Sequence, residues 1–234
     1  MLSRRSYMMV AMLSFIGGYV DTFGFIALFG LFTAHITGNF VLMGAMIVHP
    51  MHGGLLKFLA FPAFLLGVVV SRVIVLDYEV RQRSPLKILF VLQAILLTGF
   101  MIAGSMAPYP LDADRNVAAI VAGMLGAAAM AIQATGGRTI LTFIVHTSMM
   151  TGNVTHMFID IVDIIYSKNE GLKRQAYARL RQLTPAVAAF MLGAISAAFG
   201  YMKLSFWSLC LPIALLIVLA FRARQEAWQN RQDN

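Results

Sequence analysis

Among the ionisable residues in apolar parts of the chain, Asp21 and Arg138 are the first candidates for function. Asp21 lies about two-thirds of the way along the apolar run Tyr7–Leu31, and Arg138 follows two adjacent glycines in the second half. A charged side chain at the centre of a bilayer costs at least roughly 2.5–3.5 kcal/mol on insertion scales, so it needs a partner or changes its protonation. We predict an Asp21–Arg138 contact, acting as a gate, a proton-coupling site or a structural ion pair. Snorkelling of Arg138 to the inner surface is the alternative.

Two histidines precede two copies of one tripeptide. His35 comes shortly before Thr37-Gly38-Asn39, and His146 comes shortly before Thr151-Gly152-Asn153. A histidine titrates near neutral pH and is a common metal ligand, so each could relay protons or bind haem or a metal. The alternative is that both are hydrogen-bonded packing residues.

The repeated Thr-Gly-Asn tripeptide indicates two breaks in helical structure. Glycine can end one helix and begin another, while threonine and asparagine cap helix N-termini. Short apolar segments follow each copy, Phe40–Val48 and Val154–Tyr166. Their free N–H groups would present two positive dipole ends, which suit an anion, a carboxylate or a carbonyl group. Ordinary capping at the membrane surface is the alternative.

Two acidic residues lie on the second short segment, Val154–Tyr166. Asp160 and Asp163 are three residues apart and therefore share one helix face. Because they adjoin a basic stretch, we predict a solvated cytoplasmic face, with a cation or proton site as the alternative.

The composition determines the solvent in which these residues act. Of 234 residues, 59% are hydrophobic and only 12% are charged, and there is a single cysteine. So few charged side chains cannot cover a soluble protein of this size. A soluble enzyme, a disordered chain and a disulfide scaffold are excluded, and no catalytic motif or cofactor-binding loop is recognisable. We predict an integral membrane protein without enzymatic activity or a bound cofactor.

Six apolar runs are each long enough to cross a membrane as a helix. The first continues past any signal-peptide cleavage pattern, so we interpret it as a retained helix. Small residues in the fourth and fifth runs favour close helix packing. The runs are about Tyr7–Leu31, Leu55–Leu76, Leu86–Met106, Val117–Ala134, Thr184–Met202 and Leu204–Phe221.

The net charge of +8 is explained by topology. Thirteen of the eighteen basic residues lie in four segments between or beyond the apolar runs, whereas the alternate loops are neutral or acidic. The positive-inside rule makes these segments cytoplasmic and places both termini there. A nucleic-acid partner is therefore not expected. The segments contain Arg4 and Arg5; Arg81, Arg83 and Lys87; Lys168, Lys173, Arg174, Arg179 and Arg181; and Arg222, Arg224 and Arg231.

The two tripeptides mark an internal repeat, because they lie 114 residues apart and the same shift places the third apolar run on the sixth. The first copy covers about residues 7–106 and the second about 116–222, within one transmembrane domain of residues 1–234. Three crossings in each copy would invert the second relative to the first. Inverted repeats with broken helices are typical of secondary transporters and channels, with gene duplication alone as the alternative.

Several stretches resemble a known family. Residues 18–22 (Gly-Tyr-Val-Asp-Thr) and 34–39 (Ala-His-Ile-Thr-Gly-Asn) are similar to the first signature of the YoaK family of bacterial membrane proteins. Gln133 with residues 150–153 is similar to its second signature, although Ala134 stands where that family often has asparagine. The resemblance covers nearly the whole chain. It implies a multi-pass protein of the bacterial inner membrane whose function is unknown.

The sequence therefore predicts an all-α integral membrane protein with six transmembrane helices, two short broken helices and two inverted three-helix repeats. Its predicted function is that of a small secondary transporter or channel for a small solute, anions included. A haem- or metal-binding membrane protein and a non-transporting scaffold or sensor are the alternatives. The expected partners are the lipid bilayer and the solute, and a homodimer is left open. The predicted solute-binding residues are Asp21, His35, Thr37, Gly38, Asn39, Gln133, Arg138, His146, Thr151, Gly152 and Asn153.

Overall fold

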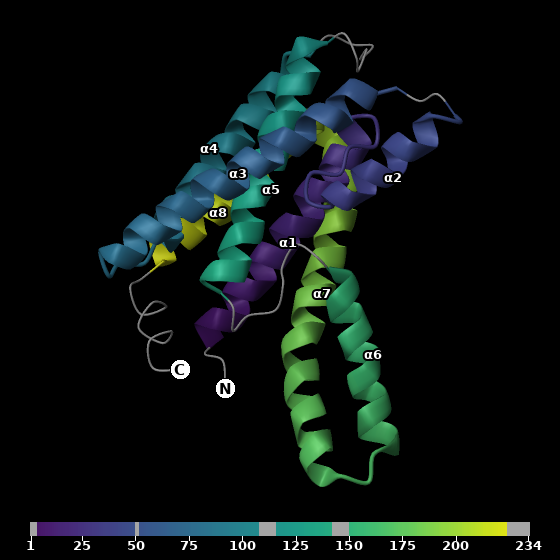
Figure 1. The fold of residues 1–234 in the computed structure, drawn as a ribbon, viewed down its shortest axis with the longest axis vertical. Helices are drawn as coiled ribbons and strands as arrows, with labels where there is room; N and C mark the ends of the chain where they lie inside the picture. Colours follow the sequence, from purple (N-terminus) through teal and green to yellow (C-terminus); the bar gives the residue numbers. More distant parts are fainter. Residues whose placement is uncertain (1–3, 50–51, 108–115, 142–149, 224–234) are drawn as a thin grey trace.

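The computed structural model describes residues 4–49, 52–107, 116–141 and 150–223, and all regular structure in these residues is helical (Figure 1). The prediction of an all-α chain is confirmed for them. The elements are α1 (Arg4–Ala27), α2 (Ile36–Met46), α3 (Gly54–Val80), α4 (Leu86–Ser105), α5 (Val117–Thr139), α6 (Met150–Tyr166), α7 (Glu170–Leu204), the 3-10 helix η1 (Ser205–Leu209) and α8 (Cys210–Arg222).

Five helical stretches in the described residues are long and apolar enough to cross a membrane. Large apolar side chains on their outer faces are exposed, as on α3, where Leu66, Val69 and Val73 are each more than half exposed. An apolar exterior of this extent is typical of helices surrounded by lipid. The protein is therefore a multi-helical membrane protein. The stretches are Ser6–Ala27, Gly54–Val80, Leu86–Ser105, Val117–Thr139 and Glu170–Arg222.

The last stretch contains both the fifth and the sixth predicted runs. It joins α7, η1 and α8 into 53 residues. Ser205 has a φ of 49°, and the chain turns there, so that α7 and α8 run in opposite directions (Figure 1). The turn comes directly after α7 ends at Leu204. This is one residue beyond Lys203, which separates the fifth and sixth predicted runs.

Two helix pairs form the core of the molecule. Helix α1 packs along α7, and α3 packs along α5. A Cβ atom added at Gly193 of α7 would lie 2.1 Å from the Phe15 carbonyl oxygen, and one added at Gly67 of α3 would lie 2.7 Å from the Ala128 carbonyl oxygen. Glycine therefore allows each pair to approach at the level of the backbone, as small residues do in membrane helices.

The two pairs meet at what we call the pair interface, the contact of α1–α7 with α3–α5. Helices α1 and α5 touch there over a much shorter stretch than within either pair, and α4 packs against α5 and α8. An aromatic cluster fills one part of the core: the ring of Phe23 lies 5.4–5.7 Å from those of Phe100, Tyr201 and Phe206, in edge-on contacts. These contacts join α1, α4, α7 and η1.

Helix α6 and the first part of α7 form an antiparallel hairpin that extends away from the other helices (Figure 1). Asp160 faces α7 and is 1% exposed, and its Oδ1 accepts hydrogen bonds from Nε (3.0 Å) and Nη2 (2.5 Å) of Arg179. The predicted solvated face is therefore wrong for Asp160, because Arg179 covers its carboxylate. Asp163 is half-buried.

Candidate functional site

The chain breaks between α1 and α2, but not at the tripeptide. Phe29 and Gly30 have φ values of 53° and 76°, which turn the chain in the left-handed region after α1. Residues 37–39 lie within the first turn of α2, and residues 151–153 lie within the first turn of α6. The sequence predicts a helix break at each tripeptide. For the first copy this prediction is wrong, because the chain turns at Phe29–Gly30, before the tripeptide, and residues 37–39 are already helical.

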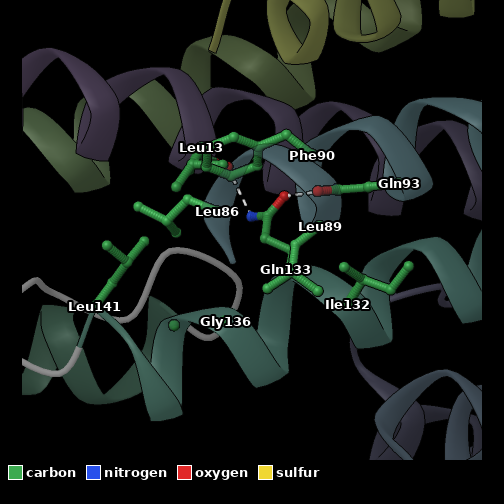
Figure 2. Close-up of a pocket in the computed structure, with 10 residues that line it drawn as sticks. Leu13, Leu86, Leu89, Phe90, Gln93, Ile132, Gln133, Gly136 and Leu141 are labelled. Atoms are coloured by element: carbon green, nitrogen blue, oxygen red, sulfur yellow. Dashed lines mark hydrogen bonds between the residues drawn. The ribbon is translucent and has the colours of Figure 1, made fainter. Parts of the chain in front are cut away.

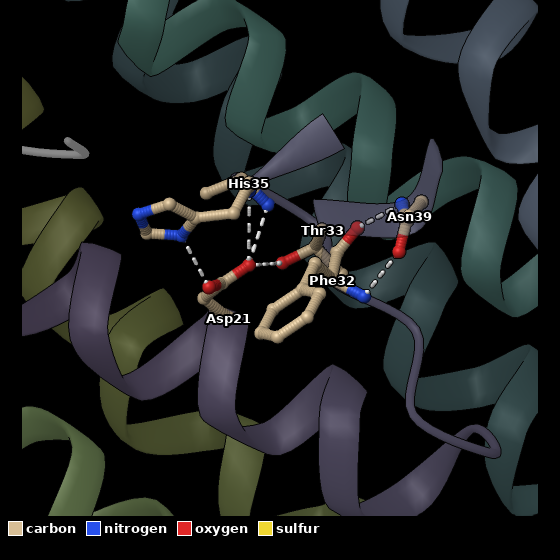
Figure 3. Close-up of polar contacts among 6 residues, drawn as sticks. Asp21, Phe32, Thr33, His35 and Asn39 are labelled. Carbon is tan, nitrogen blue, oxygen red and sulfur yellow. Dashed lines mark hydrogen bonds and ion pairs between the residues drawn. The ribbon is translucent and has the colours of Figure 1, made fainter. Parts of the chain in front are cut away.

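Asp21 projects from α1 into this break (Figure 3). Its Oδ1 accepts hydrogen bonds from the N–H of Ala34 (2.6 Å), the N–H of His35 (3.4 Å) and Oγ1 of Thr33 (3.4 Å). The residue is 5% exposed. The N–H groups of residues that precede a helix have no hydrogen-bond acceptor within it. The buried carboxylate supplies that acceptor, at the positive end of the α2 dipole.

The other oxygen of Asp21 contacts the imidazole of His35. Oδ2 of Asp21 lies 2.6 Å from Nδ1 of His35, whose side chain is 31% exposed. His35 lies in the segment between α1 and α2, outside the helical stretches that are long enough to cross a membrane. The hydrogen bond to Asp21 raises the pKa of His35 above its ordinary value of 6.5, against an opposing effect of burial. The pair can therefore hold a proton beside the break.

The side chains of Asn39 and Lys57 also form hydrogen bonds with the segment between α1 and α2. The Asn39 amide accepts from the N–H of Phe32 (2.9 Å) and donates to its carbonyl oxygen (2.8 Å). Lys57, in the first turn of α3 and 2% exposed, donates from Nζ to the Phe29 carbonyl oxygen at 2.5 Å. In this conformation Asn39 is a positioning residue. Lys57 is not among the predicted site residues, because a single lysine in an apolar run forms no recognisable pattern.

Arg138 does not contact Asp21 in the described structure. Its Nη1 donates to the carbonyl oxygen of Ala134 in α5 at 3.3 Å, whereas the Asp21 carboxylate contacts Thr33, Ala34 and His35. The predicted contact is therefore wrong. Its physical reason is topological. Figure 1 shows that α5 ends beside the beginning of α1. Asp21 lies near the end of α1, which runs from Arg4 to Ala27.

The second half contributes fewer described contacts. Asn153 is 6% exposed, and its Nδ2 lies 3.2 Å from the sulfur of Met150. His146 lies outside the described residues, so its role as a proton relay or a ligand of haem or a metal stays a prediction. Within residues 4–49, 52–107, 116–141 and 150–223, no three or more His, Cys, Asp or Glu side chains gather as a metal site would require.

Gln133 lies at the pair interface (Figure 2). Its Nε2 donates to the Leu13 carbonyl oxygen of α1 at 2.8 Å, and its Oε1 accepts from Nε2 of Gln93 in α4 at 3.0 Å. Both glutamines are buried and line a cavity of about 10 Å³ between α1, α4 and α5. That volume is close to the minimum for one water molecule. The sequence analysis missed Gln93, a single amide in an apolar run.

A comparison with protein families gives one match. The family model described as "Protein of unknown function (DUF1275)" matches residues 9–222. The match confirms the resemblance to a family without an assigned function. No curated protein and no solved structure matches the chain.

Proposed function

The chain belongs to the DUF1275 family, and we propose that it is a small secondary transporter or channel for a small polar solute. The proposal places it in the bacterial inner membrane, with six crossings, both termini cytoplasmic and the solute path at the pair interface. The observation that carries it is the arrangement of two close-packed helix pairs around buried amides. The remaining predicted site residues, Thr37, Gly38, His146, Thr151 and Gly152, belong to the proposal as predictions.

Packing of helices from one half against helices of the other half supports an inverted repeat. Helices α1 and α5 open the two halves, and each packs against a helix of the other half, α1 on α7 and α5 on α3. Glycine allows close backbone approach in both pairs, through Gly18 and Gly193 between α1 and α7 and through Gly67 between α3 and α5. A twofold relation between the halves would produce this reciprocal pairing. The opposite directions of α7 and α8 support counting them as two crossings.

The pair interface is suited to alternating access. Within each pair, glycine contacts fix the backbones against each other, so a pair can move as a rigid body. Between the pairs, the Gln133–Leu13 hydrogen bond crosses from α5 to α1. A cavity of about 10 Å³ is too small for a solute, so passage requires the pairs to separate.

The Asp21–His35 pair is proposed as the coupling and gating group. A change in the charge of His35 would alter its contact with Asp21 and so the hold of that carboxylate on residues 33–35. The carboxylate lies beside the beginning of α2, the helix end where the sequence predicts an anion, and accepts from the N–H groups of Ala34 and His35. The geometry at α2 therefore favours proton coupling over anion binding there. An anion at the start of α6 stays part of the prediction.

A non-transporting scaffold or sensor is the second candidate. The observation that favours it is the closeness of the helix pairs together with the small cavity. The two candidates differ in whether the pair interface opens. A haem protein would instead show visible absorbance after purification.

Reconstitution into liposomes tests the transporter proposal. Uptake of small neutral, anionic and cationic solutes is measured with and without a pH gradient. We expect flux above that of protein-free vesicles, and loss of its pH-gradient dependence in Asp21→Asn. Asp77→Asn removes an exposed carboxylate, paired with Arg81 at the end of α3, and is the matched control. The proposal fails if no solute enters faster than into empty vesicles, and the coupling role fails if both variants behave alike.

A further inference from the structure

We infer that Gln93 and Gln133 form a binding site for the N–H or O–H group of a small neutral solute. The site lies where α1, α4 and α5 meet (Figure 2). The inference rests on the proposed transport function and specifies the class of solute. Its basis is a buried hydrogen-bond acceptor that the described chain leaves unpaired.

The Leu13 carbonyl oxygen determines the orientation of the side-chain amides of Gln133 and Gln93. A carbonyl oxygen can only accept, so the amide group that faces it must be the Nε2 of Gln133. The Oε1 of Gln133 then faces Gln93 and must receive its Nε2. The assignment of nitrogen and oxygen in both side chains therefore follows from the hydrogen-bond chain. What remains at its end is the Oε1 of Gln93, which can only accept.

This oxygen has no hydrogen-bond partner among the residues that the structure describes. Gln93 is 0% exposed, so bulk water does not reach the atom either. Buried polar groups are almost always paired, and an acceptor that the protein does not satisfy indicates a donor from outside the chain, such as water or a ligand. Gln93 lines the cavity, which supplies the space for that donor.

The lining of the cavity selects a neutral donor. Apart from the two glutamines, its lining residues are apolar side chains and the two glycines at positions 136 and 137. None of them is ionisable, so nothing there balances the charge of an anion or a cation. The free acceptor also repels an anion. A Cβ atom added at Gly137 would meet no atom within 4 Å, so the site has room to widen on that side.

The site and the pair interface are mechanically connected. The Gln133–Leu13 bond that orients the amides is also the bond that crosses between the pairs. In the described conformation the cavity fits a single water molecule. Separation of the pairs would exchange that water for a solute donor on the same acceptor.

Acetamide and acetate test the site because they have the same size and shape. Acetamide is neutral and donates through its NH₂ group, whereas acetate is charged and only accepts. Binding of each to purified protein in detergent is measured by saturation-transfer NMR. Gln93→Leu removes the acceptor, and Gln175→Leu changes an exposed glutamine on α7 as the control. The melting temperature of each variant establishes that it is folded.

We expect acetamide to bind and acetate not to bind. Gln93→Leu should lose about tenfold in acetamide affinity, as for one hydrogen bond, while Gln175→Leu retains binding. The site is refuted if acetamide does not bind, if acetate binds equally, or if Gln93→Leu binds acetamide as the wild type does.

Acetamide flux into liposomes separates this inference from the proposed function. Binding that depends on Gln93 without any flux would refute transport and leave the site standing. Flux that Gln93→Leu does not alter would refute the site and leave transport standing.

Discussion

Replacement of Asp21 tests how the break between α1 and α2 is held. Asp21→Ala removes the acceptor for the Ala34 N–H at 2.6 Å and for His35 Nδ1 at 2.6 Å. Asp21→Asn keeps an oxygen for Ala34 but loses the charge and one acceptor. The two variants therefore separate the hydrogen bonds from the charge.

The expected magnitudes follow from burial. Breaking a buried charged pair by removing one partner costs about 3–5 kcal/mol. Because the His35 side chain is 31% exposed, water replaces part of the loss, and we expect Asp21→Ala to lower the free energy of unfolding by ~2–4 kcal/mol. Asp21→Asn should lower it by ~1–2 kcal/mol, since charged hydrogen bonds exceed neutral ones by about that amount.

Titration with SDS in mixed micelles, followed by circular dichroism, measures these free energies. Asp77→Asn breaks only an exposed ion pair and should cost less than ~1 kcal/mol. A double-mutant cycle of Asp21→Asn with His35→Gln should give a coupling of ~1–3 kcal/mol. The reasoning is refuted if Asp21→Ala costs no more than Asp77→Asn, or if the coupling is zero.

Three further predictions concern packing, the hairpin and pH. Gly193→Ala should destabilise the protein by ~1–3 kcal/mol or more, because its Cβ would meet backbone, whereas Gly152→Ala has nothing within 4 Å and should be neutral in the same titration. Asp160→Asn should speed amide hydrogen exchange in α6 by weakening its bonds to Arg179; unchanged exchange would contradict the buried ion pair. Because the folded pKa of His35 is raised, its contribution to stability should be complete below pH 6.5 and lost as the pH rises through the raised pKa. His35→Gln should flatten that pH dependence, and an unchanged pH profile would count against the Asp21–His35 contact.

The spanning helices could be predicted from the sequence because lipid requires long apolar runs. The beginning of α7 could not. The predicted run begins at Thr184, but the helix begins at Glu170, since its polar first part is stabilised by α6 through the Asp160–Arg179 pair. Hydropathy carries no signal for a polar helix of this kind.

The site was predicted by residue type but not by partner. Asp21, His35 and Asn39 were all singled out, yet Asp21 pairs with His35 because the left-handed turn at Phe29 brings the chain back to α1. A phenylalanine gives no indication of a positive φ. Gln93 and Lys57 were missed because a lone polar residue in an apolar run has no spacing pattern.

The central claim is that the two helix pairs move relative to each other, and distances between spin labels test it most directly. With Cys210 replaced by serine, labels at Met202 of α7 and Val117 of α5 span the pair interface, and labels at Leu55 of α3 and Val117 lie within one pair. All three positions are exposed. In liposomes, the account predicts two distances for Met202–Val117 whose populations change with solute or pH, and a single distance for Leu55–Val117. A single, unchanging distance for both label pairs would contradict it.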